Sequence, residues 1–342
     1  MKKILIILII LFGLFLFVFN SCSNGNGFGN LTNTKKSFSV VSWNVQTFFD
    51  ANNDGSEYAD FLKSKTWNEE MYSERVNRLC KVMTTLNADI YVFEEIENEA
   101  VIQDICNGLS AHKWNSTGIW NYACFSKEPE SSIGCAVISK YELWDLSNHS
   151  IEAGSPKLLQ PALRAIGKVK VKIGNKDFVL FVNHWKSKSS GEFETEIWRI
   201  KQESILTNLV CETVEENQNC PILICGDFNK NIEEFEYIDS VEKGNVLLKS
   251  KYPYDDQAIA VFSPWYDEHG NYTCNTGSYY YKNSWEYIDN FFVYGSFDIL
   301  DFEACTDDLW TKDNNIPNGF KIYTGEGYSD HLPIKITLQF KN

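Results

Sequence analysis

The sequence lacks a CxxC pair, a surplus of positive charge and any internal repeat, and these absences narrow the class of protein. None of its ten cysteines has another cysteine three positions away, which argues against a zinc ribbon or a thioredoxin-type site. Lysine and arginine total 31 against 46 aspartates and glutamates, so the formal net charge is −15. This acidity argues against broad, metal-free binding to a polyanion, but it permits a local basic groove or a phosphate bridged by a metal.

The remaining totals are ordinary for a globular protein. The chain has 342 residues, of which 44% are hydrophobic and 23% are charged. No second linker interrupts residues 37–342, which are therefore expected to form one domain. With Cys22 set aside, nine cysteines remain, so at least one thiol has no partner within the chain. An oxidising compartment would allow disulfides among the others, but the sequence does not give their pairing.

Residues 1–22 are expected to be a signal peptide. Two lysines precede an apolar run from Ile4 to Phe19, which is a few residues short of the ~20 that span a bilayer. A small residue directly before Cys22 is typical of a bacterial lipoprotein processing site, and ordinary secretion and an uncleaved anchor are the alternatives. We therefore expect a protein of the bacterial cell envelope or the extracellular space, attached to a membrane through a lipidated Cys22. Residues 23–36, rich in Asn, Gly, Ser and Thr, are expected to be a flexible linker.

The most informative stretch is a short apolar strand that ends in polar residues. Residues 221–225 are apolar, and Gly226-Asp227-Phe228-Asn229 follows directly. Alternation along an extended chain places Asp227 and Asn229 on one side, at the carboxyl end of the strand, where α/β sheets gather ligands. A carboxylate beside an amide suits a hard divalent cation and a phosphate oxygen, although the same residues also occur in plain turns.

Several other predicted strands also carry polar side chains at one end. We expect strands over residues 38–43, 89–93, 134–138, 168–173 and 177–182, and helices over Trp67–Leu86 and Glu194–Val214. The strand-end residues are Asn44, Glu95, His184, Asp227, Asn229, Asp289, Asp330 and His331. Acids can bind a cation such as Mg²⁺, amides can hold phosphate oxygens, and a histidine paired with an acid can take a proton from water. The set therefore indicates metal-assisted phosphoester hydrolysis.

The residues after His184 have two interpretations. Lys186 and Lys188 either meet an oxyanion or belong to a basic surface loop. In the helix that follows, Arg199 and Gln202 are expected to lie outside the core-facing stripe.

Two other segments also have two interpretations. Asp50–Gly55 resembles the first half of a calcium loop, but Phe61 stands where such a loop carries a bidentate Glu, and a solvated turn is the alternative. The aromatic residues within 262–287 either pack beneath a long loop or stack on bases, sugars or lipid headgroups.

In their order along the chain, these motifs resemble those of the endonuclease/exonuclease/phosphatase superfamily, the deoxyribonuclease I-like proteins, over nearly all of residues 37–342. The matching motifs are Trp43-Asn44, Glu94-Glu95, Asn183-His184, Gly226-Asp227-Phe228-Asn229, Ile288-Asp289 and Ser329-Asp330-His331-Leu332-Pro333. Residues 183–188 and 95–98 are most similar to the secreted bacterial nuclease-like branch. The resemblance implies an α/β fold: a four-layer sandwich of two packed mixed β-sheets flanked by helices.

The resemblance also implies a metal site and a substrate site. The implied metal ligands are Glu95 and Asp330, with Asn44 and Asp227 near the same or a second cation. Mg²⁺ is the implied cofactor, with Mn²⁺ or Ca²⁺ as alternatives. Lys186, Lys188 and Asn44 are the expected substrate-binding residues.

The implied catalytic residues are two histidines and their polar neighbours. Asp289 would orient His331, which acts as the general base on water. His184 would give a hydrogen bond or a proton to the phosphate, while Asp227 and Asn229 position the nucleophile and the phosphoryl oxygens. Family members differ over whether the aspartate matching Asp227 or the His–Asp pair activates water, so these two roles can exchange.

The sequence departs from the family pattern at two positions. Glu94 stands where a Gln usually precedes the metal-binding Glu. Family nucleases often support the first histidine with an acid near the strand at Gly134. Here the nearest acids are Glu128 and Glu130, and the sequence does not decide whether either reaches His184.

The leading hypothesis is a metal-dependent phosphodiester hydrolase, a secreted or surface-anchored endonuclease that uses water activated by a His–Asp pair. We expect a monomer that acts on nucleic acid, DNA or RNA, without a protein partner. The alternatives that keep the same residues are a sphingomyelinase-like phospholipid phosphodiesterase and a sugar- or lipid-phosphate phosphatase. A non-catalytic surface lipoprotein would have lost a catalytic position, and none is lost here.

Overall fold

The computed structural model describes residues 16–18, 37–111, 120–152, 159–235, 237–240, 244–247 and 259–341. The linker 23–36, Cys22 and most of the expected leader lie outside these residues. Within the leader, β1 (Leu16–Val18) pairs with β4 (Tyr122–Ser126). The signal peptide, the lipidation and the linker therefore stay predictions.

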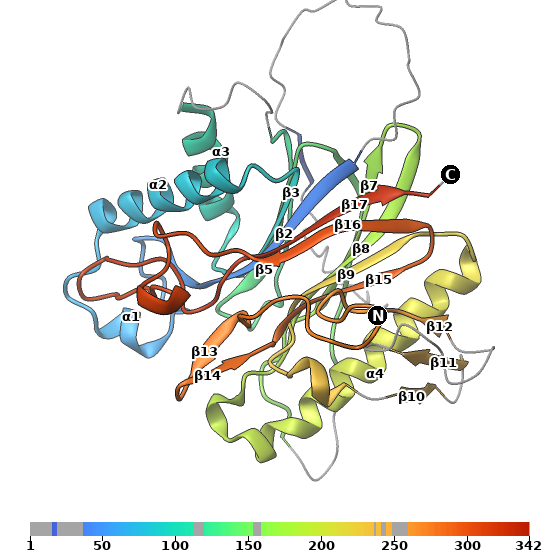
Figure 1. The fold of residues 1–342 in the computed structure, drawn as a ribbon. Coiled ribbons are helices and arrows are strands. Elements are labelled where there is room, and N and C mark those ends of the chain that lie inside the picture. Colours follow the sequence, from blue (N-terminus) through green and yellow to red (C-terminus); the bar gives the residue numbers. More distant parts are fainter. Residues whose placement is uncertain are drawn as a thin grey trace, which may run out of the picture.

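The first of two large sheets has seven strands in the order β1-β4-β5-β3-β2-β17-β16 (Figure 1). Its further strands are β5 (Gly134–Ser139), β3 (Ile90–Ile96), β2 (Ser37–Phe48), β17 (Ile334–Phe340) and β16 (Phe297–Ala304). β2 runs parallel to β3, and β17 runs antiparallel to β2. The carboxyl ends of β2 and β3 and the amino end of β17 therefore meet at one edge.

The second sheet has five strands in the order β15-β9-β8-β7-β6. They are β15 (Asp289–Tyr294), β9 (Ile222–Asp227), β8 (Lys176–His184), β7 (Ile166–Ile173) and β6 (Glu142–His149). β8 and β9 are parallel, and β15 is antiparallel to β9. This sheet thus repeats the arrangement of the first, with two strands ending and one beginning at the same edge.

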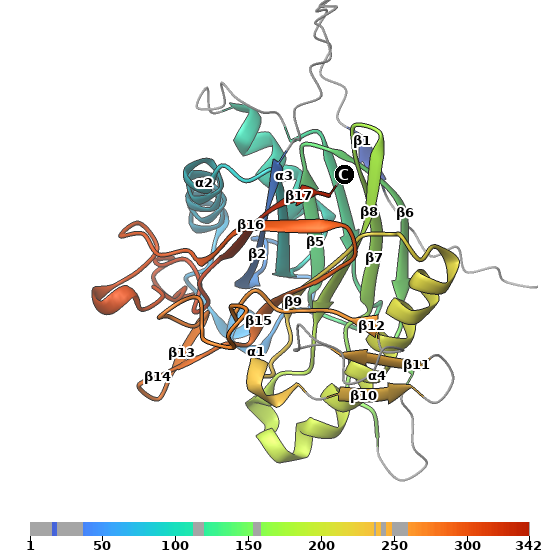
Figure 2. The same cartoon turned by 45° about the vertical axis from the view of Figure 1, so that its right-hand side comes forward.

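The two sheets pack face to face between helices, as the resemblance implied. β8 and β9 contact β2, β3 and β5 across the interface. α2 (Glu69–Leu86) and α3 (Glu99–Ala111) lie outside the first sheet, and α4 (Glu192–Glu216) lies outside the second (Figures 1 and 2). Because both faces of the second sheet are covered, β9 is buried along its whole length, which explains its continuous apolar sequence.

The smaller elements decorate this sandwich. They are α1 (Ala59–Lys63), short 3-10 helices at Lys188–Ser190, Ile232–Glu234 and Asp313–Asn315, and strands β10 (Tyr237–Ser240), β11 (Gly244–Leu247), β12 (Ile259–Ala260), β13 (Tyr279–Tyr281) and β14 (Ser284–Glu286). In the described part of the chain, no helix combines the length and the apolar character needed to cross a bilayer.

Local sequence explains the predicted helices and turn. α2 begins after Asn68, whose side chain accepts a hydrogen bond from the Met71 backbone N–H at 3.1 Å, and ends at Asn87 in the left-handed region. A two-residue turn at Gly174-Asn175 joins β7 to β8. The strands expected near Asn44, Glu95, His184 and Asp227 are all present. The sequence interpretation did not include α3, β4, β6 or β16.

One expectation about α4 was wrong. Arg199 and Gln202, expected outside the core stripe, are fully buried. Arg199 donates to the carbonyls of Lys186, at 3.1 Å, and Glu192, at 2.8 Å, while Gln202 accepts from the Lys186 backbone N–H at 2.9 Å. The two side chains are buried because they satisfy backbone groups of the segment after β8, so they fix the position of that strand end.

Candidate active site

The strand ends of both sheets form one polar site. Asn44 lies near the end of β2 in register with Glu94 of β3, and His184 is in register with Asp227 at the ends of β8 and β9. Asp289 begins β15 opposite Asp227, and Asp330 and His331 immediately precede β17. The parallel strands β2, β3, β8 and β9 end at this edge, and the antiparallel strands β15 and β17 begin there, so residues distant in sequence lie close together.

The backbone at this edge adopts conformations that most residues avoid. Glu95 and Asn229 have positive φ of 68° and 49°. Gly226 has φ of +135°, and a Cβ there would lie 1.9 Å from the backbone oxygen of Asn183. Only glycine therefore permits β9 to approach β8 this closely just before Asp227. Such unusual conformations cluster at functional sites.

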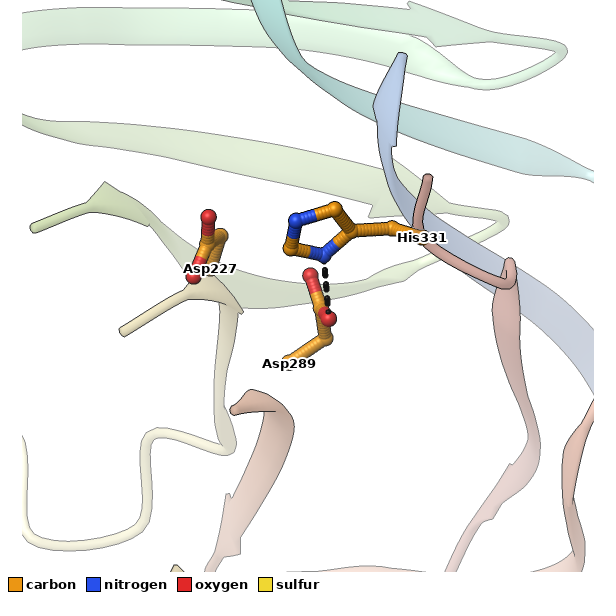
Figure 3. Close-up of side chains that lie close together, drawn as sticks. All are labelled: Asp227, Asp289 and His331. Carbon is orange, nitrogen blue, oxygen red and sulfur yellow. Dashed lines mark hydrogen bonds and ion pairs between the residues drawn. The ribbon is translucent and has the colours of Figure 1, made fainter. Parts of the chain in front are cut away.

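A buried histidine–aspartate dyad lies at the centre of the site. Nδ1 of His331 lies 2.8 Å from Oδ2 of Asp289, and Nε2 faces Asp227 (Figure 3). Burial opposes the charged imidazolium, but the Asp289 carboxylate and nearby acids outweigh burial and raise the pKa of His331 well above its usual value. The second oxygen of Asp289 is buried without a hydrogen-bond partner among the described residues. The dyad thus holds the imidazole in one orientation, as a general base requires.

Asp227 lies between the two histidines. Its oxygen, that of Asp289 and a ring nitrogen of His331 all lie within 4.8 Å of one another, while Oδ2 lies 3.7 Å from Nε2 of His184. Asn229 donates its backbone N–H to Oδ1 at 2.8 Å, and Asn44 donates its side-chain amide to Oδ2 at 2.9 Å. Burial and the charge of Asp289 raise the pKa of Asp227 to about 7.

Glu95 is held beside Asp227 by the same amide and by the end of β2. Asn44 donates to Oε1 of Glu95 at 3.2 Å, and the backbone N–H of Thr47 donates to Oε2 at 2.5 Å. The buried guanidinium of Arg75 donates to the carbonyls of Val45 and Thr47, both at 2.9 Å, and so fixes this turn. Glu95 is therefore oriented by the Thr47 backbone and by the buried Asn44 side chain.

These residues fit a hard divalent cation. Half-buried Asp330 has a pKa raised by burial and by the charge of Glu95, and Asp227 behaves similarly. Carboxylate pKa values rise in this way when negative charge is concentrated without compensation. Carboxylate oxygens are the donors that Mg²⁺ prefers. The ligand atoms that the described structure brings within 4.8 Å of one another at this site belong to Asp227, Asp289 and His331, whereas Glu95 and Asp330 lie outside that group. As placed here, Asn44 turns its NH₂ toward the carboxylates, while its oxygen accepts from Gln46 N–H at 2.9 Å.

His184 is buried, and no acid among the described residues supports its Nδ1. Its Nδ1 has no hydrogen-bond partner among the described residues, and Glu128 accepts from Ser150 instead, at 2.6 Å. No hydrogen bond or ion pair joins Glu128 or exposed Glu130 to His184 in the described structure. Burial, followed by the charge of Arg164, lowers the pKa of His184 well below its usual value. The imidazole is therefore neutral at pH 7 and can act as a hydrogen-bond donor or acceptor.

The structure adds two residues that the sequence interpretation missed. Arg164 lies with Nη2 3.3 Å from Nε2 of His184 and has no ion pair with a described carboxylate. Tyr279 lies against His331, with ring centroids 4.7 Å apart. Arg164 stands in an irregular segment without periodicity, so no sequence signal identified it. Tyr279 belongs to the aromatic region already noted.

The two lysines differ in their surroundings. Lys188 forms ion pairs with Glu192, at 2.8 Å, and with Glu234, at 3.4 Å, so its charge is compensated within the protein. Lys186 is half-buried, and burial and the charge of Arg164 lower its pKa. Its own charge in turn contributes to the lowered pKa of His184, which places it near the site.

The Asp50–Gly55 turn lies near a second acidic group. Carboxylate oxygens of Asp54, Glu57 and Glu97 lie within 4.8 Å of one another. Backbone N–H groups already serve these acids, since Asp54 N–H donates to Glu57 at 2.8 Å and Asp50 N–H to Glu97 at 2.5 Å. Phe61 packs in a small hydrophobic cluster. Calcium binding by this turn stays a hypothesis.

None of the nine cysteines in the described part of the chain forms a disulfide. They are Cys80, Cys106, Cys124, Cys135, Cys211, Cys220, Cys225, Cys274 and Cys305.

Comparison with known proteins places this site in a family. Truncated TDP2 from Caenorhabditis elegans is 16% identical with a TM-score of 0.55, covering 89% of this chain and 97% of that one. An endonuclease/exonuclease/phosphatase family protein from Bacteroides thetaiotaomicron is 17% identical with a TM-score of 0.53, covering 90% and 100%. ANGEL2, a 2′,3′-cyclic phosphatase, is 14% identical with a TM-score of 0.56, covering 97% and 100%. At these identities the likeness shows the fold alone.

No protein of curated function matches the chain. The model of the Endonuclease/Exonuclease/phosphatase family matches residues 39–340, which is almost the whole folded chain. The chain therefore belongs to the endonuclease/exonuclease/phosphatase family.

Proposed function

We propose that this protein is a metal-dependent phosphodiesterase, and that it acts as an endonuclease on nucleic acid at the bacterial cell envelope or outside the cell. The observation that carries the proposal is the buried His331–Asp289 dyad facing Asp227, with Glu95 held beside it. The family supplies phosphoester hydrolysis as the general chemistry. The secreted bacterial nuclease-like branch and the nuclease substrate are our assignments.

The dyad handles the proton of the attacking water. Asp289 accepts from Nδ1 of His331, which places Nε2 on the side of Asp227. Because nearby acids raise the pKa of His331 well above its usual value, Nε2 would take a proton once a bound cation has offset their charge. Asp227, held by Asn229 and Asn44, orients the nucleophile and can exchange the role of base with His331. A divalent cation held by Glu95, Asp330 and Asp227 would neutralise these carboxylates and polarise the phosphate.

Two groups on the opposite side of Asp227 are suited to the phosphoryl oxygens. Neutral His184 can donate one hydrogen bond, and Arg164 supplies a cation that no described carboxylate neutralises. A guanidinium binds phosphate oxygens through two parallel hydrogen bonds. Asn229 adds an amide, Lys186 can attract the substrate's charge, and Lys188 contributes less because of its ion pairs.

Nucleic acid is favoured as substrate by what structural relatives bind. Danio rerio TDP2, 13% identical with a TM-score of 0.51, has been solved with a single-strand DNA product, and ANGEL2 with adenosine-2′,3′-vanadate. The chain's acidity and its exposed aromatic side chains near the site favour the second candidate, a sphingomyelinase-like phospholipid phosphodiesterase or a sugar- or lipid-phosphate phosphatase.

A substrate panel separates these candidates. Purified protein is incubated with DNA, RNA, sphingomyelin vesicles and sugar phosphates, each with Mg²⁺, Mn²⁺, Ca²⁺ or EDTA. We expect internal cleavage of nucleic acid that requires a divalent cation. Turnover of vesicles or phosphomonoesters without nucleic acid cleavage would support the second candidate. Activity that persists in EDTA would contradict both candidates, because each requires a divalent cation.

Membrane attachment is a separate proposal that depends on Cys22. Cys22→Ser should move the protein from the membrane fraction to the medium or periplasm and abolish labelling by radioactive palmitate. Unchanged fractionation and labelling would contradict lipidation at this residue.

A further inference from the structure

A two-stranded hairpin places two tyrosines beside the catalytic dyad. Lys282-Asn283 joins β13 to β14, and its φ values of 47° and 65° are those of a tight hairpin turn. Tyr279 and Tyr281 share one face of β13, with ring centroids 6.1 Å apart and planes at 21°. We call these two rings the tyrosine ladder. It leads from the His331 ring to solvent, where Tyr281 is 48% exposed.

The ladder is fastened to the catalytic segments by backbone contacts. Ser278, which is fully buried, accepts from Leu332 N–H through its carbonyl at 2.7 Å and from Asp289 N–H through its hydroxyl at 3.1 Å. Tyr279 also forms a β-bridge with His331. A ligand on the ladder therefore has a fixed position relative to the dyad, and its nearest attached phosphate would lie at the site.

The ladder has charges of both signs around it. Glu286 lies directly opposite Tyr279 in the hairpin, and its half-buried carboxyl has Lys188 as well as the acids Glu192 and Glu234 nearby. Nζ of Lys282 lies 5.0 Å from the centroid of the Tyr281 ring, so a phosphate on this face would meet both a cation and acids. A flat uncharged ring gains stacking area on Tyr281 whichever sign of charge lies nearby.

We propose that the tyrosine ladder is a stacking subsite for the nucleobase next to the scissile phosphate. The proposal rests on the proposed nuclease function and specifies its substrate. A paired base is already stacked within its duplex, so a base can lie on Tyr281 only when it is unpaired. The preferred substrate is therefore a single-stranded segment or a frayed end.

The test uses the full-length protein with Mg²⁺ and three oligodeoxynucleotide substrates. They are a single strand, the matching duplex, and a single strand with abasic sugars around one defined phosphate. Tyr281→Ala and Tyr281→Phe are compared with wild type. The control is Tyr323→Ala, which removes a tyrosine ring that is 60% exposed and does not belong to the ladder. Thermal melting verifies that each variant is folded.

We expect wild type to cleave the single strand faster than the duplex. Tyr281→Ala should lower kcat/KM on the intact strand by roughly 5- to 150-fold, mainly through KM, because stacking is lost. Tyr281→Phe, which keeps the ring, and the Tyr323→Ala control should stay near wild type. At the abasic site the difference between wild type and Tyr281→Ala should nearly disappear.

Three results would overturn the ladder proposal alone: faster cleavage of the duplex, no loss in Tyr281→Ala, or equal losses on intact and abasic strands. A loss in Tyr281→Phe as large as in Tyr281→Ala would assign the effect to the hydroxyl and also refute stacking. If wild type hydrolyses bis(p-nitrophenyl) phosphate but cleaves neither these oligodeoxynucleotides nor RNA, the nuclease function fails, and the ladder proposal fails with it.

Discussion

Replacing Asp289 by asparagine should disable the dyad while leaving its shape. The hydrogen bond of 2.8 Å between Asp289 and His331 is buried and carries charge. Such a bond contributes ~1.5–3 kcal/mol. At ~1.4 kcal/mol per pKa unit, its loss should lower the pKa of His331 by about 1–2 units. An amide can also favour the wrong imidazole tautomer, so we expect kcat at pH 7 to fall by roughly 10²- to 10⁴-fold.

Two measurements check this expectation. Nuclear magnetic resonance of the imidazole in metal-free protein gives the pKa of His331, and steady-state kinetics with Mg²⁺ give kcat. Asp177→Asn, an exposed change at the far end of β8, is the matched control and should change neither. Asp289→Asn combined with His331→Ala should be no worse than His331→Ala alone, because the two residues act as a unit.

The reasoning would be refuted by an Asp289→Asn variant with kcat within threefold of wild type. Additive losses in the double variant would equally show that Asp289 acts independently of His331.

Three further predictions concern the site. Glu94→Gln should stabilise the metal-free protein relative to wild type, and increasingly so as pH rises from 5 to 8. Burial raises the pKa of Glu94 in the folded state well above 4.5, so the carboxyl ionises first in the unfolded state and the free energy of unfolding of wild type falls by up to ~1.4 kcal/mol per pH unit. A difference in melting temperature that does not change with pH would contradict this prediction. Gly226→Ala should lower the free energy of unfolding, measured by urea titration, by ~3 kcal/mol or more. Gly174→Ala, where an added Cβ would meet open space, should lower it by ~1–2 kcal/mol. Equal losses would contradict the close approach of β9 to β8. Arg164→Gln should lower kcat/KM by roughly 10- to 100-fold without changing Mg²⁺ affinity, and weakened Mg²⁺ binding would place its role elsewhere.

The sequence allowed much of the fold to be predicted because the central strands are apolar runs with polar ends. β9 and β8 show this plainly, since β9 is buried throughout, β8 is buried from Phe178 onward, and each ends at a functional side chain. The edge strand β6 was missed because only one of its residues is buried, so its pattern is weak. Arg199 was wrongly predicted to lie outside the core because the sequence does not distinguish an arginine that is buried and donates to backbone carbonyls from one on the surface.

The sequence could not show which of the site residues lie close to one another. Asp289 and His331 stand 42 positions apart, and only the antiparallel start of β15 and the entry to β17 bring them together. That no described carboxylate reaches Nδ1 of His184 could be seen only in the structure, as could the place of Arg164, because both depend on the path of irregular segments.

The most direct test of the central claim is the rate of bis(p-nitrophenyl) phosphate hydrolysis, which does not depend on the natural substrate. Wild type, Glu95→Gln and His331→Ala are compared with Mg²⁺, with EDTA and after Mg²⁺ is restored. The account predicts turnover by wild type that EDTA abolishes and Mg²⁺ restores, and losses of at least ~100-fold in both variants. Turnover that persists in EDTA, or variants that match wild type, would contradict it.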